Sequence, residues 1–419
     1  MRYVKSIFAA VLIAVCVYGF AMAKGDAPAP AMNVAPVIRE LKSPLFAQPA
    51  FAMPGQDIPV SVELLTQGKV TAAILSPFDK PETQERFPIP AAKESEGVKA
   101  FSFKIPKSFK PGLYDLCVEI DYSGLTSKDC QKHAVSIVKS FNPPFKIVQL
   151  TDYHMGDPRA EKQFSGVDIK KVRVTALEAA NRENPVFVLF TGDITAYPQT
   201  YERDYPAAYE ELVSTLRVPA VIIPGNHDFY TWLDNKGNVT MDGVNYWKSF
   251  FGDMHRVLDY GPFRFVLFNS YDWVPFVRNQ NMEYSLKSGK AHTYSGTLSE
   301  SEFKWVEAAL KGAGKRIPVL VAHHGIREME TNPVQWCKNC ARTDQTLRII
   351  KKYGVKYYFY GHIHKSMEFE LDGTKYFATI STGSDVNPGN FWGMRIIDAD
   401  KNNKITTKVV QLFDAPPMK

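Results

Sequence analysis

The chain has 419 residues, of which 45% are hydrophobic and 22% are charged, and its formal net charge is +6 at pH 7. This composition is typical of a packed globular protein and excludes a disordered, collagenous or coiled-coil chain. The basic excess is small and contains no long run of lysine or arginine, so the sequence does not indicate a nucleic-acid-binding protein.

The N-terminus has the features of a secretory signal peptide in their usual order. Arg2 and Lys5 precede an uncharged run over residues 7–20, and small residues then occupy the two positions that a signal peptidase reads in 21–23. The run is shorter than the ~20 residues of a spanning helix. We therefore expect 1–23 to be removed and the protein to be periplasmic or secreted, without a stable membrane span; the alternative is an uncleaved anchor. Residues 24–45 are expected to form a linker.

Between residues 46 and 140, hydrophobic residues alternate with polar ones, as they do in strands with one buried face. The clearest runs cover residues 58–64, 70–74, 101–105 and 113–121. Proline and glycine separate these runs, and almost no helical pattern occurs. The region is predicted to be a small all-β immunoglobulin-like sandwich.

Four cysteines remain after the predicted cleavage. A turn at Ser123-Gly124 would place Cys117 opposite Cys130, which predicts a cross-strand disulfide; two free thiols are the alternative. The second pair, Cys337 and Cys340, follows Trp336. Because no strand leads into a helix there, a disulfide that pins a loop is favoured over a redox site or a zinc clip.

From residue 145 to 415, short and wholly apolar runs alternate with helical patterns. Such runs predict strands that are buried on both faces of a sheet covered by helices. The runs cover residues 146–150, 185–190, 218–223, 263–268, 317–322 and 356–360. A capping box at 299–302 predicts a helix through Leu310, and residues 371–374 predict a hairpin turn.

Five of these runs end in side chains that bind metals. In open α/β sheets the carboxyl ends of the strands form the binding crevice, so these side chains should converge. One histidine at a strand end is more often structural, but five such ends in succession indicate a site. Mixed oxygen and nitrogen ligands suit borderline or hard divalent ions, and the absence of cysteine disfavours a structural zinc site. The set is Asp152, His154, Asp193, Asn226, His323 or His324, His362 and His364.

The ordered motifs D-x-H, G-D, G-N-H-D, H and G-H-x-H resemble those of the calcineurin-like metallophosphoesterase superfamily over residues 146–410. The resemblance implies an α/β (α+β) fold, a four-layer αββα sandwich of two mixed sheets with a two-metal site. It implies that one metal is bound by Asp152, His154 and His364, that Asp193 bridges the metals, and that the second metal is bound by Asn226, His323 and His362. His323 is favoured over His324, which stays an alternative.

The resemblance also implies the chemistry. Two divalent ions, such as Mn, Fe or Zn, would bind a phosphate ester and activate a bridging hydroxide for in-line attack. His227 resembles a histidine that stabilises the transition state or protonates the leaving oxygen. Asp228 is expected either to orient His227 or to be a turn residue. Purple acid phosphatases have a tyrosine three residues after the bridging aspartate, and Ala196 at this position disfavours that iron–tyrosinate subtype.

The leading hypothesis is therefore an exported phosphoesterase that acts on phosphate monoesters or diesters. An extracytoplasmic binding or adhesion protein on an inactive phosphoesterase scaffold is the alternative, and a redox protein that uses Cys337 and Cys340 is a third reading. Arg327 could clamp phosphate. Three histidines outside the motifs, His133, His255 and His292, are expected to be non-catalytic. Neither the metal identity nor an oligomeric state follows from the sequence.

Overall fold

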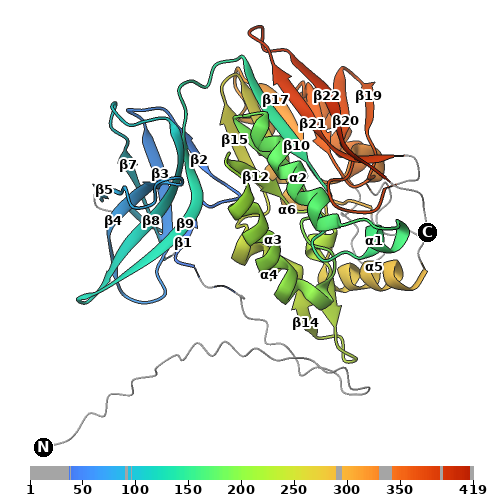
Figure 1. Cartoon of the computed structure of the whole chain (residues 1–419), viewed down its shortest axis with the longest axis horizontal. Coiled ribbons are helices and arrows are strands. Elements are labelled where there is room, and N and C mark those ends of the chain that lie inside the picture. The colour runs from blue at the N-terminus through green and yellow to red at the C-terminus, as the bar shows by residue number, and fades with distance from the viewer. Residues whose placement is uncertain are drawn as a thin grey trace, which may run out of the picture. The chain divides into compact units, whose positions relative to one another are not determined.

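A computed structural model describes residues 37 and 39–415 apart from 90–92, 96, 289–294, 330–341 and 387–389 (Figure 1). The predicted signal peptide, most of the predicted linker, His292 and the pair Cys337 and Cys340 lie outside the described residues. Within the described part of the chain, no helix combines the length and the apolar character that crossing a membrane requires.

The N-terminal region consists of two sheets. One has the order β1-β3-β7-β6 and the other the order β2-β9-β8-β4-β5. The strands are β1 (Leu41–Ser43), β2 (Ala50–Ala52), β3 (Asp57–Glu63), β4 (Lys69–Pro77), β5 (Glu85–Pro88), β6 (Lys93–Ser95), β7 (Val98–Lys104), β8 (Gly112–Tyr122) and β9 (Leu125–Ile137). Alternate side chains of both sheets, such as Val60 of β3 and Val118 of β8, fill one hydrophobic cluster. The predicted period-two pattern is thus the pattern of a shared core.

The border of this region differs from the prediction. Strand β1 lies inside 24–45, the predicted linker, and pairs antiparallel with β3 because Leu41 is fully buried in the cluster between the two sheets. Phe46 and Ala47 begin the predicted sandwich, yet both pack into the cluster formed with the helices of the C-terminal region. The linker is therefore shorter than expected, and the segment after β1 belongs to a different core.

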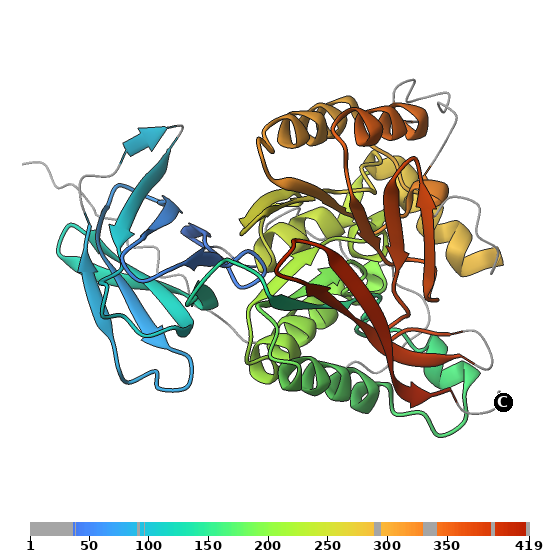
Figure 2. The ribbon, with the colours of Figure 1, turned by 90° about the horizontal axis from the view of Figure 1, so that it is seen from above.

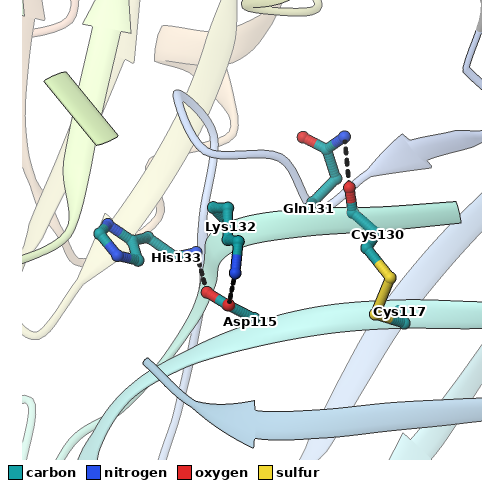
Figure 3. Close-up of a disulfide and its surroundings, with 6 residues drawn as sticks. All are labelled: Asp115, Cys117, Cys130, Gln131, Lys132 and His133. Atoms are coloured by element: carbon teal, nitrogen blue, oxygen red, sulfur yellow. Dashed lines mark hydrogen bonds and ion pairs between the residues drawn. A yellow bond between two sulfur atoms is a disulfide. The ribbon is translucent and has the colours of Figure 1, made fainter. Parts of the chain in front are cut away.

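The predicted register of the first cysteine pair is confirmed. Cys117 of β8 lies directly opposite Cys130 of β9, and their sulfur atoms are 2.00 Å apart. Figure 3 shows the bond between the two sulfur atoms. Beside them, the Asp115 carboxylate accepts a hydrogen bond from the His133 backbone and pairs with Lys132. His133 is part of β9 and so lies in the N-terminal region.

The C-terminal region contains two mixed sheets with helices on both outer faces, which confirms the predicted four-layer class. One sheet has the order β12-β11-β10-β21-β22 and the other the order β15-β16-β17-β18-β20-β19. In Figure 2, the helices α6 and α7 (orange) and α2 (green) lie on opposite sides of the strands. The strands are β10 (Phe145–Leu150), β11 (Phe187–Thr191), β12 (Ala220–Ile223), β15 (Arg256–Tyr260), β16 (Phe263–Leu267), β17 (Ile317–Val321), β18 (Tyr357–Tyr360), β19 (Met367–Leu371), β20 (Thr374–Ala378), β21 (Phe391–Ala399) and β22 (Ile405–Asp414).

The helices are α1 (Arg159–Gln163), α2 (Ile169–Arg182), α3 (Tyr201–Thr215), α4 (Gly243–Phe250), α5 (Pro275–Ser288), α6 (Glu300–Lys311) and α7 (Thr343–Lys352). Short 3₁₀ turns are η1 (Pro198–Thr200), η2 (His227–Phe229) and η3 (Ile326–Glu328), and a small hairpin consists of β13 (Thr231–Leu233) and β14 (Val239–Asp242).

Strand β10 shows why the central strands are wholly apolar. Its Ile147 packs between the two sheets, whereas Val148 and Leu150 pack under the outer helices. Both faces of the strand are buried, so apolar side chains lie on both faces instead of alternating with polar ones.

Two local predictions are also informative. The hairpin turn at 371–374 is confirmed, because Leu371 pairs with Thr374 at the tip of β19 and β20. Helix α6 begins as predicted, with Ser299 accepting a hydrogen bond from the Glu302 backbone. The Glu302 carboxylate, however, accepts from the Asn269 backbone at 3.0 Å and pairs with His255 at 2.9 Å. It joins the helix to the loop after β16.

Candidate metal centre

Loops that follow five strands bring the predicted ligands together. Each loop starts at the carboxyl end of its strand: β10, β11, β12, β17 and β18. The site contains four groups of three residues, and in each group the three ligand atoms lie within 4.8 Å of one another. The groups are Asp152, His154 and His364; Asp152, Asp193 and His323; His323, His324 and His362; and His154, Asp193 and His227.

The first group leaves polar atoms in need of a partner. His364 Nε2 lies 3.2 Å from Asp152 Oδ1, and His154 Nε2 lies 3.3 Å from Asp193 Oδ2. Within the described part of the chain, the buried Asp152 Oδ1 and His154 Nε2 make no hydrogen bond. Buried polar atoms are seldom left without one. A cation between these atoms would satisfy both, so the residues present fit a divalent metal.

Asp193 lies at the centre of the site. Its Oδ2 is 3.1 Å from His323 Nε2 and 3.3 Å from His154 Nε2, while its Oδ1 accepts a hydrogen bond from the His227 backbone. A carboxylate that two ions share must face the histidines of both. Asp193 does so.

The other side of the site, where the second metal is predicted, is built around His323. Its Nδ1 donates to the Thr191 carbonyl at 2.7 Å, which leaves Nε2 to face Asn226 Oδ1 at 3.0 Å. The adjacent His324 contacts Ser270 Oγ through Nδ1, and its ring lies 4.3 Å from that of His362 between centroids. Both histidines therefore border this part of the site, and the geometry keeps His324 as an alternative ligand.

Glycine in two motifs permits the close approach of the loops. A Cβ on Gly225 would lie 2.1 Å from Asp193 Oδ1, and one on Gly361 would lie 1.8 Å from Thr151 Oγ1. Neither position has room for a side chain. The glycines of G-N-H-D and G-H-x-H thus let the ligand loops pack against each other.

Five of the candidate ligands have a left-handed backbone. The φ angles are 52° at Asp152, 48° at His154, 55° at Asp193, 69° at His362 and 48° at His364. Such angles are uncommon in non-glycine residues, although aspartate and histidine adopt them more often than most. Clusters of this kind are typical of functional sites, where the surrounding structure holds a strained conformation.

Opposite charges dominate the electrostatics of the site. Burial alone would raise the pKa of Asp152 and Asp193, but the neighbouring histidines hold the pKa of each carboxyl below its usual value. Burial opposes the charging of the histidines in turn, yet Asp152 raises the pKa of His364 to about 10, and Asp193 raises the pKa of His323 to about 9. Burial lowers the pKa of His362 to about 3.

Of the two roles expected for Asp228, the structure favours that of a turn residue. Among the described residues, its carboxylate accepts from Gly225 N at 2.8 Å, Ile194 N at 3.2 Å, and Thr195 N and Oγ1 at 2.8 and 3.1 Å, rather than from the imidazole of His227. The two residues are adjacent in a tight turn, so their side chains diverge. Asp228 instead ties the Asn226 loop to the Asp193 loop.

His227 does lie in the site. Its Nδ1 donates to the Ala196 carbonyl at 2.8 Å, and its ring is 4.6 Å from that of His154 between centroids. Burial lowers the pKa of His227 to about 3, so the imidazole is neutral with Nε2 as an acceptor.

Three charged residues near the site were not anticipated. Asp157, Arg159 and Asp385 form an ion-paired group against the Nδ1 atoms of His154 and His364. The sequence offered only one hint, an aspartate three residues after His154.

Other predicted residues lie elsewhere. Arg327 stacks on the Phe369 ring at 4.0 Å, which engages it with β19. Its expected role as a phosphate clamp stays a prediction. The ring of His133 lies against that of Phe78, and His255 pairs with Glu302, so both imidazoles contact residues outside the ligand set. Their expected non-catalytic role stays a prediction.

Comparisons with known proteins agree with this geometry. A model of the calcineurin-like phosphoesterase family matches residues 145–366. A 3',5'-cyclic adenosine monophosphate phosphodiesterase of Escherichia coli is 26% identical over 291 residues, covering 64% of this chain and 90% of its own length. A probable glycerophosphodiester phosphodiesterase of Arcobacter nitrofigilis is 27% identical over 197 residues, covering 45% and 62%.

Solved structures that resemble this chain include a purple acid phosphatase from yellow lupin. It is 14% identical, with a TM-score of 0.49, and the match covers 86% of this chain and 71% of that one. A dimetal phosphatase from Danio rerio is also 14% identical, with a TM-score of 0.48 and coverage of 65% and 98%.

Proposed function

The chain belongs to the calcineurin-like phosphoesterase family and is a hydrolase of phosphoric ester bonds, and we propose that it is exported and cleaves phosphodiesters with two divalent ions. The preference for diesters is supported by the relatives, which are named phosphodiesterases. Export is supported by the N-terminal sequence, and oxidation of Cys117 and Cys130 would follow in an oxidising compartment.

The observation that carries the proposal is the pair of buried atoms, Asp152 Oδ1 and His154 Nε2, that a cation would satisfy. Two bound ions would neutralise phosphoryl charge and make a bridging water acidic enough to supply a hydroxide at neutral pH. One ion would be held by Asp152, His154 and His364, and the other by Asn226, His323 and His362, with Asp193 between them. His324 is the alternative to His323.

The chain's own groups then position the ester. Asn226 is neutral, so it adds no negative charge where an anionic substrate must bind, and its Nδ2 donates to the Tyr230 hydroxyl at 2.9 Å. His227 has its Nδ1 proton committed to Ala196, which favours Nε2 as an acceptor that orients a hydroxyl group or water. This arrangement supports an orienting role over donation of a proton to the leaving oxygen.

The direct test uses the mature chain, stripped with a chelator and reloaded with Mn²⁺ or Zn²⁺. We expect hydrolysis of bis(4-nitrophenyl) phosphate to require metal and to be at least tenfold faster than hydrolysis of 4-nitrophenyl phosphate. Asp193→Ala should lose turnover together with bound metal. Turnover that survives chelation would contradict the two-ion proposal. Bound metal without hydrolysis of either ester would favour a binding protein instead.

A further inference from the structure

We propose that Arg159 is a positioning residue of the first metal site, because it holds the carboxylates of Asp157 and Asp385 against the two histidines of that site. The inference rests on the metal binding proposed above. It concerns the side of each imidazole that faces away from the metal.

Each histidine of the first site is contacted on both ring nitrogens. On the outer side, His154 Nδ1 lies 3.4 Å from Asp157 Oδ2 and 3.4 Å from Arg159 Nη2. His364 Nδ1 lies 2.9 Å from the Asp385 carbonyl and 3.3 Å from Asp385 Oδ1. On the inner side, His154 Nε2 faces Asp193 and His364 Nε2 faces Asp152. An oxygen acceptor on Nδ1, as at His364, fixes the tautomer that presents Nε2 to a metal and makes the ligand more basic.

Arg159 joins the two carboxylates. Its Nε and Nη2 donate to Asp157 Oδ2 at 2.7 and 2.6 Å, and its Nη1 lies 3.2 Å from Asp385 Oδ1. Nη2 also donates to Ser384 Oγ at 3.2 Å. A loop after β10 is thereby tied to a loop before β21, more than 200 residues later in the chain.

The charge balance gives this contact its importance. The Asp157 side chain is only 1% exposed, so water cannot stabilise its charge, and an unpaired buried carboxylate is strongly unfavourable. Without the guanidinium, Asp157 and Asp385 would also repel each other and an incoming anionic ester. Arg159 neutralises both while leaving their oxygens next to the histidines.

The same contacts argue against direct binding of substrate by Arg159. Its Nε and both terminal nitrogens already serve Asp157, Asp385 and Ser384, and its side chain is 35% exposed. A guanidinium can reach three acceptors at once because its donors form a planar fork, whereas a lysine ammonium acts as a point charge. Lysine at this position should therefore restore only part of the function.

The experiment measures metal binding to the stripped, full mature chain by isothermal titration with Mn²⁺. We expect Arg159→Met to bind one of two ions 10- to 100-fold more weakly than wild type, in line with the loss of other groups behind metal ligands. Arg159→Lys should lie between the two. The matched control is Arg264→Met. Arg264 on β16 donates through Nε and Nη2 to the carboxylate of Asp259 on β15, with both distances 2.7 Å. This variant should bind both ions within twofold of wild type.

If Arg159→Met does not fold, Asp385→Asn provides the second variant, because it removes the charge and keeps the backbone carbonyl on His364; weaker binding of one ion is again expected. Wild-type affinity for both ions in Arg159→Met, or in Asp385→Asn where that variant is needed, would overturn the role of Arg159 alone. A wild-type chain that binds no ion would instead overturn the proposed function on which this inference rests.

Discussion

Removal of the Asp228 carboxylate should destabilise the protein by leaving buried hydrogen-bond donors without an acceptor. The side chain is fully buried and accepts four hydrogen bonds, three from backbone N–H groups and one from the Thr195 hydroxyl. Asp228→Ala would leave four buried donors without an acceptor. At about 1 kcal/mol for each donor, the free energy of unfolding should fall by about 4 kcal/mol. Asp228→Asn keeps one acceptor oxygen and should lose about half of that.

A surface aspartate provides the matched control. Asp234 accepts three hydrogen bonds of similar length, from Lys236 N, Asn238 N and Asn238 Nδ2, but at an exposed turn. Water can replace the carboxylate there, so Asp234→Ala should lower the free energy of unfolding by less than about 1 kcal/mol.

The assay is urea unfolding of the metal-free proteins, which removes stabilisation by bound ions from the comparison. The expected order of stability is wild type, Asp234→Ala, Asp228→Asn and Asp228→Ala. If Asp228→Ala and Asp234→Ala unfold at the same urea concentration, the argument that burial makes these hydrogen bonds indispensable is refuted.

Three further predictions concern the site and the cysteines. His227→Ala should retain both metals but lower kcat about 100-fold in a diester assay, because a group that orients water or the ester is lost; unchanged kcat would remove His227 from the mechanism. Carboxylates raise the pKa of His364 to about 10 and that of His323 to about 9, so both are protonated in the metal-free protein at pH 7. Metal must displace these protons. Apparent affinity should therefore rise from pH 6 to 9 with release of about two protons at pH 7, measured by calorimetry in two buffers, and buffer-independent heats would contradict this. Cys117→Ala should lower the stability of the oxidised protein by about 3 kcal/mol, as the loop that the pair closes implies, and an identical loss in wild type under reductant would identify the bond as the cause.

The strands and the convergence of the candidate ligands were predictable because each signal is local. A strand buried on both faces must be apolar along its length, as Ile147 and Val148 illustrate, and the residue that follows it must emerge at the carboxyl edge of the sheet. The register of Cys117 and Cys130 followed from a single turn. These inferences required no knowledge of the tertiary structure.

The residues that contact the outer nitrogens of the histidine ligands were not predictable in the same way. Asp385 meets His364, and Arg159 meets Asp385, only after loops distant in the sequence come together. The sequence leaves two roles open for Asp228, and only the packing of the Asp193 loop against the Asn226 loop shows which groups its carboxylate contacts. The Glu302 carboxylate likewise contacts the Asn269 backbone, which only the fold brings near.

The left-handed backbone at the ligands has a consequence for how this chain can change over evolutionary time. An L-residue with a side chain gives up about 1 kcal/mol in that conformation, and glycine does not. A descendant that no longer needed metal could replace Asp152, His154 or His364 by glycine and relieve that strain. Such substitutions would remove catalytic activity while relieving backbone strain, and only selection for activity would oppose them.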